Sequence, residues 1–163
     1  NFFPVAIEFA RATGTQVLLL GGDRNLMPAE ILEESEDLVR WFPFVPLGAV
    51  LAECAALVHH GGIGTTVAAI RQGKPQMVVP LYLDHWAQAE RVVELGVGVS
   101  LFPARWSLSA VRAALVPLLS DPAFGDRAAQ FAHMEARARP LAVALRFVEQ
   151  QTGRRAMVTA RSG

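Results

Sequence analysis

The stretch that decides the fold is ALVHHGGIGTTVAAI, residues 56–70. An apolar run ends in two histidines, a turn rich in glycine and threonine follows, and an apolar pattern with helical spacing then begins. A buried apolar run that passes through glycine into a helix is typical of a strand–turn–helix unit in a parallel sheet. We therefore predict a strand at 56–60 and a helix at 64–73, which ends at Gly73 before a proline.

The same alternation of apolar runs and helical patterns extends in both directions along the chain. It predicts strands at 16–22, 38–42, 76–80 and 97–102, and helices at 2–12, 46–55, 84–96, from Ser107 or Ser109 to 119, and from 121 onward. Asp84 is the expected cap of its helix, Asp121 and Pro122 are expected to start the terminal one, and Pro140 is expected to kink or split it. The acidic stretch 23–37 is expected to be a solvated loop.

Strands that alternate with helices predict an α/β fold with a Rossmann-like, doubly wound parallel sheet. We assign residues 1–151 to one such domain and residues 152–163 to a mobile tail. Ligands of these folds bind beyond the carboxyl ends of the strands, which is where the turn after residue 60 is expected to lie.

The composition excludes several classes of protein. Of 163 residues, 52% are hydrophobic, and 15 basic residues balance 15 acidic ones, so we expect a real core and no nucleic-acid partner. One cysteine excludes an internal disulfide. Because no apolar run approaches the roughly 18 residues of a membrane helix, we expect no transmembrane segment and a cytoplasmic protein.

The residues of the turn predict an anion site. Three glycines, Gly61, Gly62 and Gly64, are expected to allow positive φ and close backbone approach. Thr65 and Thr66 stand at the expected helix start, where free N–H groups and the helix dipole favour phosphate. Three such glycines can also serve packing alone, but His-His and Thr-Thr at the same turn favour the ligand site.

The histidines extend this prediction. His60 is the expected ligand, since an imidazole at the end of a strand can donate a further hydrogen bond, and His59 is expected to pack or support it. A zinc site from His59, His60 and His85 is disfavoured, because adjacent histidines cannot easily face one metal. Dinucleotide binding is also disfavoured, because Val67 takes the place of the third glycine of that fingerprint.

Residues 44–101 resemble the nucleotide-sugar-binding half of a GT-B glycosyltransferase, of the branch that acts on natural products, sterols and other lipophilic acceptors. The likeness rests on FVP at 44–46, HGGIGT at 60–65 and a pair at 84–85 similar to Asp-Gln, before an amphipathic helix that ends in glycine. It implies the C-terminal half of the GT-B fold. The chain opens on a helical pattern without an initiator Met, so we expect that it is cut from a longer polypeptide and that the first strand of this half precedes Asn1.

The resemblance also implies roles for residues. The donor diphosphate would contact His60, Gly62, Gly64, Thr65 and Thr66; the nucleobase would contact Val45, and the sugar would contact Asp84 and His85. It implies an inverting displacement that needs no metal and no cofactor. The general base would come from an N-terminal acceptor-binding half, in the same polypeptide or in a partner chain. No catalytic residue is therefore expected in this chain, which alone would be inactive.

Two positions depart from the family pattern. His85 stands where the family has a glutamine, and Ala68 stands where many plant members have a glutamate for the ribose hydroxyls. The expected donor is therefore either a UDP-sugar or a donor with a deoxyribose, such as a dTDP-sugar. Two other functions remain open at this point: a GT-B epimerase of nucleotide sugars, and a non-catalytic nucleotide-binding module.

Overall fold

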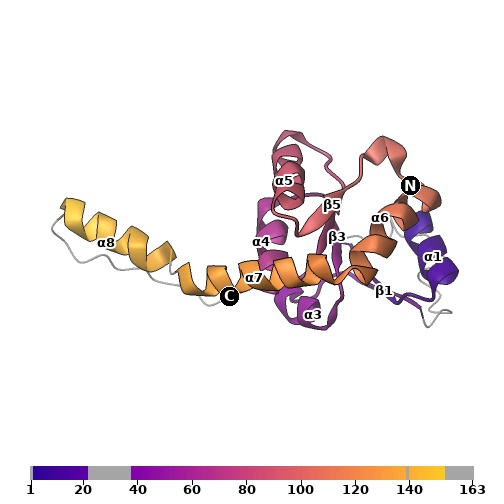
Figure 1. Cartoon of the computed structure of the whole chain (residues 1–163), viewed down its shortest axis with the longest axis horizontal. Coiled ribbons are helices and arrows are strands. Elements are labelled where there is room, and N and C mark those ends of the chain that lie inside the picture. Colours follow the sequence, from indigo (N-terminus) through magenta and orange to yellow (C-terminus); the bar gives the residue numbers. More distant parts are fainter. Residues whose placement is uncertain (1, 22–37, 139, 153–163) are drawn as a thin grey trace.

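The computed structural model describes residues 2–21, 38–138 and 140–152. Helices and strands alternate along the chain as predicted (Figure 1). The loop predicted at 23–37 and the tail from 153 onward lie outside the described residues. The elements are α1 (Phe2–Thr13), β1 (Val17–Leu20), β2 (Val39–Phe42), α3 (Leu47–Glu53), β3 (Leu57–His59), α4 (Ile63–Arg71), β4 (Gln76–Val78), α5 (Leu83–Glu94), β5 (Gly98–Ser100), η2 (Pro103–Arg105), α6 (Leu108–Ser120), α7 (Pro122–Ala138) and α8 (Pro140–Thr152).

The strands pair in parallel, in two groups. β1 pairs with β2, and β4 lies between β3 and β5. This differs from the single sheet that the sequence predicts, because no ladder among the described residues joins the two groups. They nevertheless share a core, since Val17 from β1 and Val58 from β3 pack against the same buried cluster.

Helices cover both faces of the β3–β4–β5 sheet, as expected for a doubly wound fold. Side chains alternate between the faces of a strand, and β4 displays this within three buried residues. Met77 belongs to a cluster with Phe9 from α1 and Val111 from α6. Val78 belongs to another cluster, with Val92 from α5 and Ala128 from α7.

Most of the predicted helix ends are confirmed. Gly14, Gly73 and Gly96 follow α1, α4 and α5 with φ of 69°, 62° and 67°, the left-handed conformation in which glycine ends a helix. Ser107 caps α6 by accepting a hydrogen bond from the N–H of Ala110. The segment after 121 is split, with α8 beginning at Pro140.

One cap is wrong. Asp84 was expected to cap α5, but the helix begins one residue earlier, at Leu83, with Tyr82 as the N-cap. Asp84 instead lies in the first turn, where the helix dipole stabilises a negative charge. Its side chain is therefore free of a capping bond and exposed.

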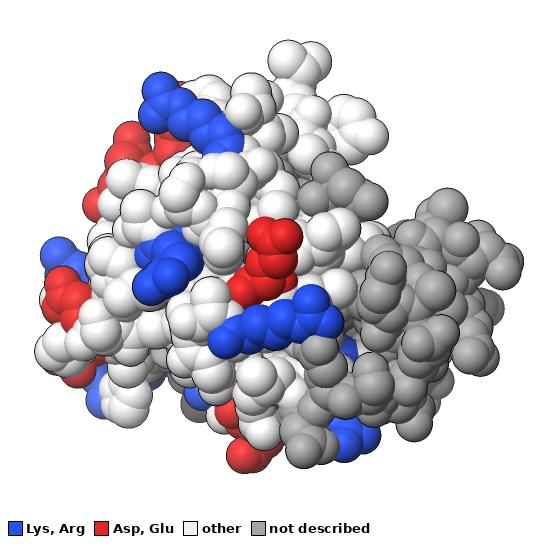
Figure 2. Space-filling view, turned by 90° about the vertical axis from the view of Figure 1, so that its right-hand side faces the viewer, with Lys and Arg blue, Asp and Glu red and all other residues white. Residues whose placement is uncertain are grey.

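The surface adds two observations. In Figure 1, α8 extends away from the sheets beyond the end of α7, and Phe147 on it is 62% exposed. Figure 2 shows basic and acidic side chains scattered singly over one face, so that face carries no broad basic surface. No helix among the described residues is both long and apolar enough to cross a membrane.

Gly98 provides a test of the fold. A Cβ at this position of β5 would overlap the carbonyl oxygen of Gln76 on β4 and lie 2.7 Å from Cγ1 of Val92. Gly98→Ala is expected to lower the free energy of unfolding by about 3 kcal/mol, measured by urea denaturation. Gly125→Ala is the matched control, because a Cβ there meets no atom within 4 Å and alanine favours helix α7 by about 1 kcal/mol. Equal free energies of unfolding for Gly98→Ala and the wild type would contradict this packing.

Candidate anion-binding site

The turn after β3 is held by His59. Its side chain is 7% exposed, and its Nδ1 accepts a hydrogen bond from the N–H of Gly61 at 3.1 Å. Nδ1 is therefore unprotonated, so Nε2 carries the hydrogen and donates to Oε1 of Gln76 at 2.9 Å. Both ring nitrogens are used within the protein, which leaves His59 as a supporting residue of the turn.

Gln76 is the functional residue that the sequence analysis missed. It is the first residue of β4 and is completely buried, with Nε2 lacking a hydrogen-bond partner among the described residues. The signal was a polar residue at the start of the apolar run QMVVP. A buried amide in such a strand requires a partner, and His59 is that partner.

Burial lowers the pKa of His59 from 6.5 to about 4. The hydrogen bond to Gln76 raises the pKa, while the neighbouring His60 and His85 lower it further. Desolvation is the largest of these effects, because a buried imidazolium loses its hydration. His59 is therefore neutral at neutral pH.

His60 lies outside the strand and is exposed. Its ring folds over the next turn, because a Cβ on Gly62 would lie 2.8 Å from its Nε2. No hydrogen bond joins its side chain to the rest of the described chain. Of the two adjacent histidines, His60 is the one whose imidazole can reach a ligand.

The N-terminus of α4 lies next to the imidazole ring of His60. Gly62 is the N-cap, without a side-chain capping bond, and the N–H of Thr66 donates to the carbonyl oxygen of Gly62 at 3.0 Å. The N–H groups of Ile63, Gly64 and Thr65 precede the first intrahelical bond and have no partner within the helix. Together with the helix dipole, they favour an anion at this point.

The three glycines act for different reasons, and Gly61 alone of the three adopts the positive φ that glycine allows. Gly61 has φ of 99° and is pressed against β4 and α5, since a Cβ would lie 3.0 Å from Val78 Cγ1 and 3.1 Å from His85 Cβ. Gly62 has φ of −61°, because it is the N-cap of a helix. The absence of a side chain at Gly62 leaves space for the ring of His60. Gly64 is helical, and no atom lies within 4 Å of its missing Cβ, so the backbone there is open.

The two threonines also differ. Thr66 is 3% exposed, and its hydroxyl donates to the carbonyl oxygen of Gly62 at 3.1 Å. Thr65 is half-buried, and its hydroxyl makes no hydrogen bond among the described residues. The Thr65 hydroxyl is thus available to a ligand, whereas Thr66 supports the start of the helix.

The remaining predicted residues lie on other segments. Val45 is half-buried in the loop between β2 and α3, and its backbone groups make no hydrogen bond with other described residues. Asp84 is exposed in the first turn of α5, while the adjacent His85 is 8% exposed. The ring of His85 lies 4.7 Å from that of His60, so α5 meets the turn after β3 at these two residues.

Large apolar side chains remain exposed around this site. Most of them follow the carboxyl ends of β3, β4 and β5, which lie at one edge of that parallel sheet, and Phe44 follows β2 of the other pair. Exposed apolar side chains gathered at one edge mark a surface that another molecule or domain covers. This apolar rim consists of Phe44, Ile63, Leu81, Tyr82, Leu83 and Phe102.

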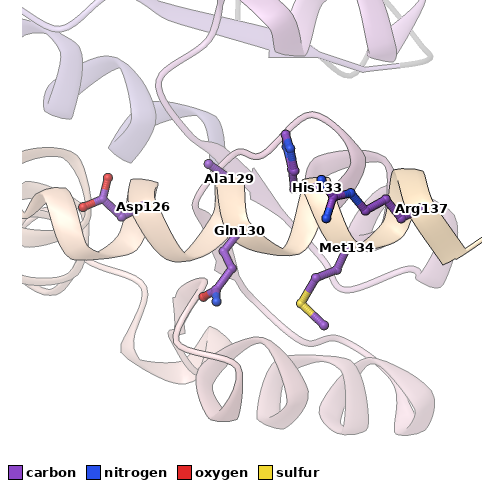
Figure 3. A pocket seen from close by; sticks show the side chains of 6 residues that line it. All are labelled: Asp126, Ala129, Gln130, His133, Met134 and Arg137. Carbon is purple, nitrogen blue, oxygen red and sulfur yellow. The ribbon is translucent and has the colours of Figure 1, made fainter.

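Other concave or polar features lie apart from this site. A groove of about 430 Å³ runs along α7 and is lined by residues of that helix alone, from Asp126 to Arg137 (Figure 3). Within the described ranges, no three histidine, cysteine or acidic side chains are grouped so as to hold a metal ion. The absence of a metal and of a cofactor from the reaction remains a prediction.

Residues 27–150 match the family described as the erythromycin biosynthesis protein CIII-like C-terminal domain. The chain belongs to this family. It is 32% identical over 146 residues to O-mycaminosyltylonolide 6-deoxyallosyltransferase of Streptomyces fradiae, covering 89% of this chain and 33% of that protein. It is 35% identical over 129 residues to erythronolide mycarosyltransferase of Saccharopolyspora erythraea, covering 78% of this chain and 29% of that protein. The chain thus spans about a third of the length of these members.

Solved structures of glycosyltransferases have the same fold as this CIII-like domain. The glycosyltransferase of kitacinnamycin superposes with a TM-score of 0.80 at 30% identity, covering 92% of this chain and 39% of that one. VinC, crystallised with dTDP, superposes with a TM-score of 0.73 at 29% identity, covering 90% and 37%. The predicted Rossmann-like half of a GT-B fold is confirmed. The site residues were assigned from the motif, and their ligand contacts remain predictions.

The buried His59 predicts a dependence of stability on pH. Its pKa is about 4 in the folded chain and 6.5 in the unfolded chain, so the unfolded state binds more protons between these values. This contribution to stability is complete above pH 6.5 and is lost as the pH falls toward 4, by roughly 3 kcal/mol in total.

The measurement is urea denaturation of the wild type and of His59→Gln at several pH values from 4 to 7. The free energy of unfolding of the variant should fall less steeply with decreasing pH. His133→Gln, at an exposed position on α7, is the control and should retain the wild-type slope. Equal slopes for all three proteins would show that His59 is protonated in the folded chain.

Proposed function

We propose that this chain is the donor-binding half of an inverting, metal-independent glycosyltransferase. It would bind a UDP-sugar or dTDP-sugar and present it to a small lipophilic acceptor. The observation that carries the proposal is the exposed His60 above the open N-terminus of α4, where three N–H groups lack helical partners. These groups and the Thr65 hydroxyl suit a diphosphate, because charge-assisted hydrogen bonds of this kind contribute about 1.5–3 kcal/mol each.

The choice of donor nucleotide rests on likeness and on one position. VinC, which shares the fold, was crystallised with dTDP. Ala68 cannot hydrogen-bond ribose hydroxyls as the glutamate of many plant members does, which favours a deoxyribose. The names of two relatives include 6-deoxyallosyl and 2-deoxy-L-fucose, so deoxysugars are the class of sugar that we propose. Asp84, exposed beside the site, is the proposed hydrogen-bond partner of the sugar hydroxyls.

The proposed reaction depends on the hydrogen-bond donors and the helix dipole at the N-terminus of α4. In the proposed reaction, an acceptor hydroxyl oxygen attacks the anomeric carbon while the bond from that carbon to the diphosphate oxygen breaks. The bonding electron pair stays on the diphosphate, and the acceptor proton passes to a base on the other half. Donors aimed at the departing diphosphate stabilise the developing charge, which is how such a site can replace a divalent ion.

The apolar rim supports a second half. Tyr82 and Leu83 are 69% and 92% exposed, beside the residues proposed to hold the donor. An acceptor-binding half packed against this rim would bury these side chains and bring its general base to the sugar. The proposed partner is such a half, in the same polypeptide or in another chain, and the chain alone would bind donor without transfer.

Calorimetric titration tests the donor class. The chain is titrated with dTDP, UDP, GDP and NADH, first without metal and then with Mg²⁺. We expect dTDP or UDP to bind without metal, with Mg²⁺ changing the dissociation constant by less than about threefold. Preference for NADH would favour a dinucleotide site, and a strict need for Mg²⁺ would contradict the metal-independent mechanism. If the chain epimerised a free nucleotide sugar, that activity would instead indicate the alternative function, a GT-B epimerase of nucleotide sugars.

His60 provides the second test. His60→Ala is expected to weaken binding of the preferred nucleoside diphosphate by about 10- to 100-fold, from the loss of one charge-assisted hydrogen bond. His133→Ala, at an exposed histidine of α7, is the matched control and should bind like the wild type. An effect of His60→Ala below about threefold would assign diphosphate binding to the backbone of α4 alone.

A further inference from the structure

His85 lies beneath the turn rather than in the open site. Although it belongs to the exposed first turn of α5, its side chain is only 10% exposed. Its Cβ and carbonyl oxygen would both lie 3.1 Å from a Cβ on Gly61, so it packs directly against the turn after β3. Its ring lies between two others, 4.7 Å from the ring of His60 and 5.4 Å from that of Tyr82.

The nitrogens of His85 have little room to bind a ligand. Nδ1 is buried and has no hydrogen-bond partner among the described residues. Nε2 faces the carboxylate of Asp84, with 4.0 Å between Nε2 and Oδ1. A buried nitrogen without a partner is costly, so the favourable contacts of His85 are those of its ring.

The ring of His85 contacts the residue on which the proposed site depends. His60 is exposed and makes no hydrogen bond within the described residues, so packing alone determines where its imidazole lies. The imidazole occupies the space that a side chain on Gly62 would fill, since a Cβ there would lie 2.8 Å from Nε2, and its ring lies 4.7 Å from the ring of His85. A side chain already held in its binding position loses less freedom when the ligand arrives.

We propose that His85 is a positioning residue, which holds the His60 imidazole over the N-terminus of α4 through ring contact. This rests on the proposed function, in which His60 binds the donor diphosphate. It assigns His85 a role different from the direct sugar contact that the resemblance implies. Asp84, which is exposed, would then contact the sugar without His85.

Three substitutions separate ring contact from hydrogen bonding. His85→Phe keeps a ring and removes both nitrogens, His85→Gln introduces the residue of the family pattern, and His85→Ala removes the ring. We expect His85→Ala to weaken nucleoside diphosphate binding about three- to tenfold, the cost of ordering one free side chain. His85→Phe should bind within about twofold of the wild type, and His85→Gln should fall between them.

A double-mutant cycle shows whether His85 acts through His60. In a His60→Ala background, His85→Ala should weaken binding by no more than about twofold further, because the positioned imidazole is already absent. Titration with the nucleoside diphosphate and with its sugar conjugate identifies the affected part of the donor. The inference is overturned if the two effects add, if His85→Phe is as weak as His85→Ala, or if only the sugar conjugate loses affinity.

Measurements on the ligand-free chain keep this test independent of the proposed function. In the NMR spectrum of the wild type, the rings of His60 and His85 should give a nuclear Overhauser effect. His85→Ala should shift the His60 ring resonances, and His85→Phe should retain the ring contact. Wild-type chain that shows this contact yet binds neither dTDP nor UDP would refute the proposed function, whereas absence of the contact would refute the positioning role.

Folding controls accompany each variant. Urea denaturation establishes that His85→Ala remains folded under the titration conditions, and His133→Ala provides a histidine variant away from the site. If His85→Ala unfolds, Gly62→Ala replaces it, because its Cβ would lie 2.8 Å from His60 Nε2 and displace the same imidazole. Gly62→Ala should then weaken diphosphate binding at least threefold, and unchanged binding would overturn the inference.

Discussion

The site depends on the close approach of the turn after β3 to the first turn of α5 at Gly61. With φ of 99° and no space for a Cβ against Val78 and His85, this position accepts glycine alone without strain. The approach brings a histidine from α5 against the histidine that follows β3.

Beneath this contact, the buried pair of His59 and Gln76 connects the turn to the central strand β4. Because Nδ1 of His59 accepts from Gly61 and Nε2 donates to Gln76, one neutral imidazole joins the backbone of the turn to the sheet. Two adjacent histidines thus have opposite environments. His59 is withdrawn into the protein to support the turn, and His60 is left exposed for the proposed diphosphate.

Much of the fold was predictable because its signals are local. Periodicity, glycine stops at Gly14, Gly73 and Gly96, and the cap at Ser107 depend on residues within one turn of each other. The motif at 60–66 located the candidate site for the same reason. Contacts between distant segments, such as the hydrogen bond between His59 and Gln76, were not predictable in this way. One local prediction was also wrong, because Asp84 was expected to cap α5 and the helix begins one residue earlier, at Leu83.

By itself, the sequence determined the order of strands and helices, the parallel α/β class and the stretch that forms the candidate anion site. The sequence also indicated His60 rather than His59 as the accessible histidine, whereas tertiary structure alone decided which threonine hydroxyl is free and where the ring of His85 lies. The reason is that the period of a helix places each side chain on one of its faces, but only packing decides which face is covered. His85 shows this most clearly: it follows the exposed Asp84 in sequence, yet the approach of α5 to Gly61 buries it beneath His60.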